Sequence, residues 1–163
     1  FDLRPLSNQQ GSSGTPFTQI MQFCEKNSKA FDYCCLGIQP TANTTSLFDR
    51  AKDFKVTYLT AEQMQIESLN WQLAFLDGFL LHHDYIYLTI CLDVFNEAFA
   101  PGVSASQMLG LSPWQVLPLL KYIKQSGKVV SIDIVELSPS YDVDHKTARL
   151  AAVMLAQLFN TQF

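Results

Sequence analysis

The sequence has little charge, and its charge is not clustered. Lys, Arg, Asp and Glu make up 16% of the 163 residues, whereas hydrophobic residues make up 48%. The formal net charge of -4 and the lack of a Lys/Arg cluster argue against a nucleic-acid partner. So few charges also predict that part of the surface is covered, by other parts of the same fold or by another subunit of a homo-oligomer.

Long hydrophobic runs are missing as well. No apolar segment reaches the roughly 20 residues that a membrane-spanning helix needs, and we identify no signal peptide, so we expect no membrane partner. The cysteines lack the paired spacing of a zinc finger. Cys34 and Cys35 are adjacent in an expected strand, so they point to opposite faces and are interpreted as core packing. We expect a cytoplasmic protein with reduced thiols.

Strand and helix patterns alternate along the chain. Strands are expected at residues 31–38, 54–59, 85–92 and 128–136. Helices are expected at 16–27, capped by Thr15, at a short segment ending near 53, at 112–126, and at 142–160, capped by Asp142. The longest helix should begin at a capping box, Thr60 with Gln63. With no repeat and no second domain, this alternation predicts one parallel α/β domain over residues 1–163.

The segment 85–102 is the strongest candidate for a functional site. It begins as an apolar strand and ends in polar residues at the carboxyl end, where open α/β sheets bind their ligands. Cys91 and Asp93 are two residues apart, so their side chains share a face of an extended chain. A thiol beside a carboxylate is a candidate pair of metal ligands. The alternative is a buried cysteine and an acid that caps a loop.

Four segments, in consistent order, resemble signature motifs of the ureohydrolase family, which includes arginases and agmatinases. Residues 1–4, Phe-Asp-Leu-Arg, resemble the end of Asp-Ala-His-x-Asp-x-Arg, and residues 89–102 resemble Ser-x-Asp-x-Asp-x-x-Asp-Pro-x-x-Ala-Pro-Gly. Residues 135–142 and the Thr-Ala-Arg-Leu-Ala of 147–151 resemble the later signature. The loop 13–17, Gly37-Ile-Gln39 and residues 100–105 resemble the formimidoylglutamase branch of this family in particular.

This resemblance implies a fold and a reaction. The implied fold is a three-layer α/β/α arrangement with a parallel sheet. Its first strands would precede Phe1, so we expect the chain to be a C-terminal portion of a longer protein. The implied reaction is metal-dependent hydrolysis of the formimino C–N bond of N-formimidoyl-L-glutamate to glutamate and formamide, in histidine degradation. The alternatives are another ureohydrolase, of agmatinase or guanidinobutyrase type, and an inactive binding or assembly module.

The resemblance also implies a binuclear manganese site, whose hydroxide attacks the amidine carbon. Asp2 and Asp93 match metal ligands of the family, and Cys91 stands where the family usually has a bridging Asp. Because a thiolate is a softer ligand, Cys91 would favour zinc or iron, or a single ion. The family's Gly-Gly-x-His and Asp-Ala-His ligands would lie before Phe1, so the chain itself is expected to hold a partial site.

Other residues are matched to the substrate, a small amidine. Glu136 matches the acid that pairs with the amidinium group, since two carboxylate oxygens can accept two parallel N–H groups. Ser13 and Thr15 lie in the loop that would contact the amino-acid end of the substrate. Asn96 and Glu97 replace an Asp-Pro pair of the family, which we expect to change the loop more than the chemistry.

The remaining candidates are interpreted mainly as structural. His82 and His83 come at the end of a helix, where imidazoles can bond to free carbonyl groups, so a metal role is disfavoured. Asp133 lies within a strand, where it could support a ligand from behind or form a buried structural hydrogen bond. Trp71 and Trp114 are interpreted as anchors of the core or of an interface.

Overall fold

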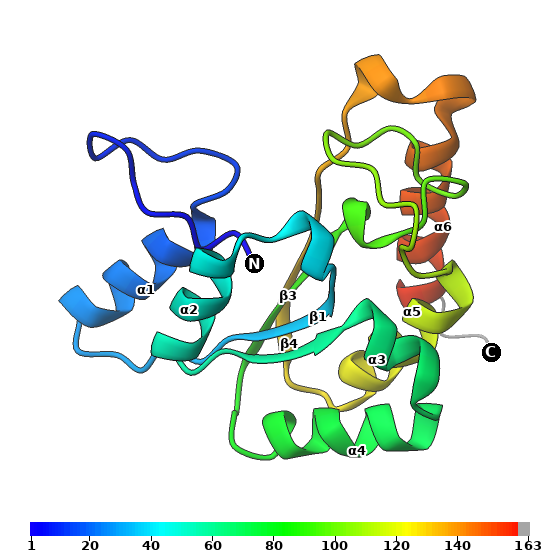
Figure 1. Ribbon diagram of the computed structural model, residues 1–163. Helices are drawn as coiled ribbons and strands as arrows, with labels where there is room; N and C mark the ends of the chain where they lie inside the picture. Colours follow the sequence, from blue (N-terminus) through cyan, green and yellow to red (C-terminus); the bar gives the residue numbers. More distant parts are fainter. Residues whose placement is uncertain (160–163) are drawn as a thin grey trace. The chain divides into compact units, whose positions relative to one another are not determined.

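The computed structural model describes residues 1–159 as parts of two compact units. Unit 1 is residues 1–60, drawn from blue to cyan-green in Figure 1, and unit 2 begins at residue 61 and runs from green to red.

Unit 1 contains two parallel strands and two helices. Strand β1 pairs in parallel with β2, with Leu36 opposite Leu59. The expected helices and strands are confirmed, although both strands begin about three residues later than the sequence suggests. In chain order the elements are α1 (Pro16–Lys26), β1 (Cys34–Ile38), the 3₁₀ turn η1 (Pro40–Ala42), α2 (Thr45–Asp53) and β2 (Thr57–Thr60).

The core of unit 1 is built around the first residues of the chain. The Phe1 ring lies edge-on to Phe48 of α2 at 5.1 Å and to Tyr58 of β2 at 5.2 Å, measured between ring centroids. Leu3 is fully buried, and its carbonyl accepts a 2.6 Å hydrogen bond from Nε of Arg50 on α2. Segment 1–3 is therefore held by both apolar burial and a charge-assisted hydrogen bond.

The described part of unit 2, residues 61–159, contains the second strand pair and four α-helices. Strands β3 and β4 pair in parallel, which places Thr89 opposite Asp133 and Cys91 opposite Val135. The parallel arrangement predicted from the sequence is thus confirmed in both units. In chain order the elements are α3 (Ala61–Ile66), α4 (Leu69–Leu80), β3 (Ile86–Cys91), η2 (Leu92–Val94), α5 (Pro113–Gln125), β4 (Val129–Val135), η3 (Pro139–Tyr141), η4 (Val143–His145) and α6 (Lys146–Phe159).

The helix expected after Thr60 is in fact two helices. Helix α3 ends at Ile66, and α4 begins at Leu69 with Ser68 as its N-cap. The Ser68 hydroxyl accepts a 3.3 Å hydrogen bond from the backbone N–H of Trp71. The prediction of one long helix was wrong because serine competes for the backbone groups of a helix and favours a cap over the interior.

Both predicted ends of α5 are confirmed in unit 2, and Asp142 caps the last helix as predicted, although that helix begins at Lys146 and not near residue 142. Ser112 and Gln115 form a capping box at the start of α5, and Gly127 follows its end with a φ of 72°. The Asp142 carboxylate accepts hydrogen bonds from the backbone N–H groups of Thr147 at 2.8 Å and Ala148 at 3.0 Å, at the start of α6. The predicted helix end at residue 160 lies outside the described residues.

The core interpretation of the tryptophans was wrong. Trp71 is 42% exposed and Trp114 is 80% exposed, both on helices of unit 2. The apolar pattern of a helix does not show which aromatic side chains lie outside the buried face. The sequence therefore could not decide whether these two tryptophans are buried or exposed. A role of either ring in an interface stays a prediction. Within residues 1–159, no helix has the length and apolar character required to cross a membrane.

Candidate active site

Strands β3 and β4 lie side by side and end together. Cys91, the last residue of β3, is opposite Val135, the last residue of β4. Figure 1 shows the two strands adjacent in unit 2. The chain after β3 carries Asp93, and the chain after β4 carries Glu136. Because parallel strands open their carboxyl ends at the same edge, two carboxylates follow the sheet at the edge where ligands bind in open α/β folds.

The structure brings Cys91 and Asp93 together, as predicted. The Cys91 thiol donates a 2.8 Å hydrogen bond to Oδ1 of Asp93, and both residues are half-buried. Leu92, which lies between them, is completely buried and anchors the short turn η2. The side chains of Cys91 and Asp93 therefore point away from the side on which Leu92 is buried. A sulfur and a carboxylate oxygen therefore form one close donor pair at the end of β3. Its use as a metal site stays a prediction.

This donor pair does not fit a manganese pair bridged by carboxylates. Among residues 1–159, no group of three or more His, Cys, Asp and Glu side chains is placed to hold a metal ion. Asp93 offers the oxygen that manganese prefers, but the thiol of Cys91 is a ligand for softer ions. Asp2 belongs to unit 1, where its backbone carbonyl accepts a 3.3 Å hydrogen bond from the N–H of Phe17 and its φ is 49°.

Glu136 is held in a defined orientation. Its φ is 68°, a left-handed conformation that is uncommon for a residue other than glycine. The Ser104 hydroxyl donates a 3.0 Å hydrogen bond to Oε2 of Glu136, which ties the loop after β3 to the end of β4. Strained backbone is often found at functional sites, where the surrounding structure maintains it. The sequence located this acid but gave no sign of its backbone conformation.

Gly102 fastens the same loop to the start of α6. Its N–H donates a buried 2.7 Å hydrogen bond to the Thr147 hydroxyl, and its carbonyl accepts one of 2.8 Å from Ser138. A Cβ at this position would lie 2.4 Å from Cβ of Asp142, so only glycine fits. The Ala-Pro-Gly segment of the motif thus has a packing reason: it brings the loop that carries Ser104 against the chain that follows Glu136.

The replacement of an Asp-Pro pair by Asn96 and Glu97 shapes the same loop. Asn96 accepts a 2.9 Å hydrogen bond from the N–H of Ala98 through Oδ1 and donates through Nδ2 to the carbonyl of Met108. Glu97 accepts a 3.1 Å hydrogen bond from the Ser106 hydroxyl. Both side chains therefore connect parts of one loop, which agrees with the expectation that they affect its conformation.

Tyr87 and Asp133 form a pair that the sequence did not reveal. The Tyr87 hydroxyl donates a hydrogen bond to Oδ2 of Asp133, while Oδ1 of Asp133 is buried without a hydrogen-bond partner among the described residues. Burial, and after it this hydrogen bond, raise the pKa of Tyr87 above its ordinary value. The pair shares a sheet face with Cys91, because Tyr87, Thr89 and Cys91 alternate along β3 and Asp133 is opposite Thr89. This pair can be found only when the register of β3 on β4 is known.

The loop residues matched to the substrate belong to unit 1. Ser13 is exposed, and Thr15 is buried. The Thr15 hydroxyl donates to the carbonyl of Ser12 at 2.9 Å and accepts from its N–H at 2.8 Å. Thr15 stands at the N-cap of α1 but makes no side-chain cap there, because its hydroxyl closes the preceding turn instead. Substrate contact by Ser13 or Thr15 stays a prediction.

The histidine at the end of α4 has the structural role expected of it. Nδ1 of His83 lies 2.7 Å from the carbonyl oxygen of Phe79, one turn earlier, and its ring packs on the Phe79 ring with centroids 4.3 Å apart. An imidazole engaged with a terminal carbonyl satisfies a backbone acceptor that the helix leaves free. The structural interpretation of His83 is confirmed.

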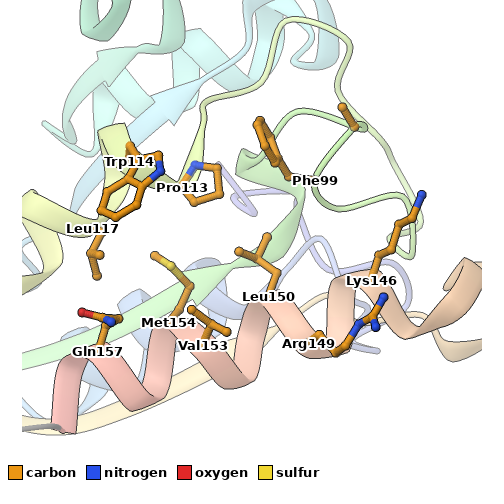
Figure 2. Close-up of a pocket in the computed structure, with 11 residues that line it drawn as sticks. Phe99, Pro113, Trp114, Leu117, Lys146, Arg149, Leu150, Val153, Met154 and Gln157 are labelled. Atoms are coloured by element: carbon orange, nitrogen blue, oxygen red, sulfur yellow. The ribbon is translucent and has the colours of Figure 1, made fainter.

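Unit 2 also contains an apolar groove away from the predicted site residues. It has a volume of about 510 Å³ and lies between the start of α5 and one side of α6. Figure 2 shows Phe99, Pro113 and Trp114 on one side and Leu150, Val153 and Met154 on the other, with Lys146 and Arg149 at one end. None of the predicted catalytic, substrate or metal residues lines this groove.

Comparison with known proteins identifies the same family by overall sequence and by individual relatives. The arginase family model matches residues 1–160. A formimidoylglutamase of Legionella pneumophila (strain Paris) is 59% identical over 162 residues, which cover 99% of this chain and 51% of that protein. A formimidoylglutamase of Clostridium tetani is 46% identical, with 98% of this chain and 47% of that protein covered. The chain spans about half the length of the curated relatives it matches.

The solved structures agree with the fold prediction. The crystal structure of formimidoylglutamase from Bacillus subtilis superimposes with a TM-score of 0.85 at 26% identity, and the match covers 96% of this chain and 49% of that one. The predicted α/β fold of ureohydrolase type, with parallel strands, is confirmed. The resemblance of the four sequence segments and the geometry at the ends of β3 and β4 thus have one explanation: the chain belongs to the arginase family.

Proposed function

We propose that the full-length protein hydrolyses the formimino C–N bond of N-formimidoyl-L-glutamate and releases glutamate and formamide. One observation carries this proposal: 99% of the chain matches a formimidoylglutamase at 59% identity. The positions of Asp93 and Glu136 at the ends of adjacent strands support it, since they put carboxylates at the edge of the sheet where a cationic substrate would bind.

Glu136 would bind the amidinium group of the substrate. A planar amidinium presents two parallel N–H donors, and a carboxylate accepts both in a charge-assisted pair. The hydrogen bond from Ser104 and the left-handed backbone of Glu136 restrict the orientation of this carboxylate before the substrate arrives. Pre-organised charge of this kind stabilises the cationic group without a reorganisation cost during the reaction.

We further propose that the reaction depends on a divalent metal, with Asp93 and Cys91 among its ligands. A divalent metal supplies a nucleophile from water near neutral pH. Because the thiol does not fit a manganese pair bridged by carboxylates, no step of the reaction is assigned to manganese at this position. Asp2 as a metal ligand, and Ser13 and Thr15 as substrate-binding residues, stay expectations from the family resemblance; all three belong to unit 1.

The remaining properties follow from the same proposal. The partner would be a small amidine in histidine degradation, handled in the cytoplasm. None of the four cysteines forms a disulfide, which suits a reducing compartment. A homo-oligomer is proposed because large apolar side chains are exposed on unit 2, among them Trp114 and Phe99 of the groove.

The test is a substrate panel with the full-length protein. Glutamate release from N-formimidoyl-L-glutamate would be measured beside agmatine, arginine and 4-guanidinobutyrate, with and without added divalent metals. The proposal predicts metal-dependent release from the formimidoyl substrate alone. Turnover of a guanidine instead would identify another ureohydrolase activity. No turnover of any substrate by a metal-loaded protein would favour an inactive binding module.

A further inference from the structure

The departure of Cys91 from the pattern of the family points to a different metal preference. We propose that Cys91 and Asp93 are a mixed thiolate and carboxylate pair that binds one divalent ion and shifts the site from manganese toward zinc, iron(II) or cobalt(II). This proposal rests on the metal dependence proposed above, and it concerns which ion the chain's own residues prefer. It does not depend on the identity of the substrate.

The geometry is close to what one ion needs. The sulfur of Cys91 and Oδ1 of Asp93 are 2.8 Å apart in the hydrogen-bonded pair. Bonds of about 2.3 Å to sulfur and about 2.1 Å to oxygen at a tetrahedral angle require a separation of about 3.6 Å. The two side chains therefore need to open by less than an ångström. As the sulfur–metal bond forms, the thiol gives up its proton to the solvent, and the hydrogen bond is replaced by two metal bonds.

The backbone on both sides of the pair is fixed. Ile90 and Leu92 are buried, and Cys91 is the last residue of β3 in register with β4. The 3₁₀ turn η2 then places Asp93 beside the sulfur. Two donors whose Cα positions are set by a strand end and a tight turn lose little conformational freedom when they bind an ion, so the pair is pre-organised.

The choice of ion follows from the chemistry of the donors. Sites with N, O or S ligands generally bind zinc or cobalt more tightly than manganese, so affinity for zinc alone proves nothing about the thiol. The relevant quantity is the change in the ratio of the zinc and manganese affinities when the sulfur of Cys91 is replaced by oxygen. Because manganese gains little from a soft donor and zinc or cobalt gains much, Cys91→Asp should move the ratio of affinities toward manganese by at least about tenfold.

The experiment uses cobalt(II) and the full-length protein. Cobalt bound to a thiolate gives a near-ultraviolet charge-transfer absorption, which does not depend on catalytic activity. Titration with cobalt should produce this absorption in the natural protein, and Cys91→Ser should abolish it. Cys24→Ser is the matched control, since the Cys24 thiol is also half-buried and outside any disulfide but lies on α1 of unit 1. It should leave the absorption intact.

Competition between manganese and zinc completes the test. The ratio of their dissociation constants would be measured for the natural protein, Cys91→Asp and Cys91→Ser, with circular dichroism to confirm folding. Asp93→Asn provides a second variant that keeps the thiol and removes the charged oxygen ligand; it should weaken cobalt binding at least about tenfold. Cobalt binding without the charge-transfer absorption, or an unchanged ratio in folded Cys91→Asp, would overturn the proposal.

The outcome is independent of the substrate assay. If the thiolate absorption appears but N-formimidoyl-L-glutamate is not hydrolysed, Cys91 and Asp93 are metal ligands and the proposed substrate is wrong. Hydrolysis of that substrate with no thiolate absorption would retain the reaction and reject Cys91 as a ligand.

Discussion

The two parallel strand pairs of this chain are built alike but end differently. In unit 1, β1 ends at Ile38 and β2 at Thr60, and both pack on an apolar core formed by the first residues and α2. In unit 2, β3 and β4 are followed by Asp93 and Glu136. Similar strands therefore serve two purposes: the first pair organises a core, and the second presents charged groups at its carboxyl edge.

The cysteines of the two strand pairs differ in the same way. Cys34 on β1 is half-buried, as Cys91 is, but desolvation, with a smaller effect of Cys35, raises the pKa of its thiol to about 12. Cys91 on β3 is half-buried and bonded to a carboxylate. A thiol in apolar surroundings acts as a packing group, whereas a thiol beside a second donor can bind a metal.

The largest effect should come from Glu136→Gln, which removes the charge at the end of β4. We expect kcat/KM for the formimidoyl substrate to fall about 100-fold, because the pair with the amidinium group loses its charge. Thermal stability should change little, since the Ser104 hydroxyl can still donate to the amide oxygen. The matched control is Glu97→Gln on the loop of the same unit, bonded to Ser106. An equal loss of kcat/KM in both variants would show that Glu136 at the end of β4 has no special role compared with Glu97 on the loop after β3.

Next in size is Gly102→Ala, which tests whether the loop after β3 is fastened to the start of α6. The added Cβ would lie 2.4 Å from Cβ of Asp142 and displace the cap of α6, so the free energy of unfolding should fall by about 2 kcal/mol. Gly78→Ala is the control: its Cβ meets nothing within 4 Å on α4, and it should stabilise by about 0.5–1 kcal/mol. Both values would come from chemical denaturation. Equal tolerance of the two substitutions would show that the loop is not held at Gly102.

A smaller effect is expected for Tyr87→Phe, on the polar face of β3. Loss of its hydrogen bond to Asp133 should cost about 1 kcal/mol near neutral pH. Since the folded state raises the pKa of Tyr87, the bond stabilises fully below pH 10.0, the ordinary pKa of the group, and less as pH rises above it. The stability of the variant should therefore fall less steeply than that of the natural protein above pH 10. Tyr85→Phe, at a 78% exposed position, is the control and should alter neither quantity.

The smallest effect concerns Cys34 and appears only at high pH. Its folded pKa of about 12 exceeds the ordinary value of 9.0, so the desolvated thiol contributes stability below pH 9 that is lost between pH 9 and 12. Cys34→Ala should leave a shallower decline of stability over that range. Alkylation measured by mass spectrometry at pH 8 should modify Cys34 more slowly than Cys91. Faster alkylation of Cys34 than of Cys91 would contradict the interpretation of Cys34 as a packing group and Cys91 as a metal ligand.

Much of this arrangement could be predicted from local sequence patterns. The segment around Cys91 and Asp93 is located by its apolar strand and following acid, and the end of α5 at Gly127 and the cap of the last helix at Asp142 by the preferences of these residues for helix ends. Each of these features depends on residues that are neighbours in the chain, so composition and spacing are sufficient to find them.

What the sequence could not predict depends on contacts between distant residues. The pair of Tyr87 and Asp133 requires the register of β3 on β4, and the bond from Ser104 to Glu136 requires the path of a long loop. The break at Ser68 was missed because the apolar stripe continues on both sides of it. The exposure of Trp114 depends on which side of α5 is covered, and a helical pattern alone does not specify this.

We propose that the chemistry of this protein takes place at the carboxyl ends of β3 and β4. The most direct measurement is anomalous X-ray diffraction from crystals of the full-length protein loaded with zinc or cobalt. We expect an anomalous peak about 2.3 Å from the sulfur of Cys91 and about 2.1 Å from a carboxylate oxygen of Asp93. A fully occupied metal peak elsewhere, with Cys91 still donating its hydrogen bond to Asp93, would contradict it.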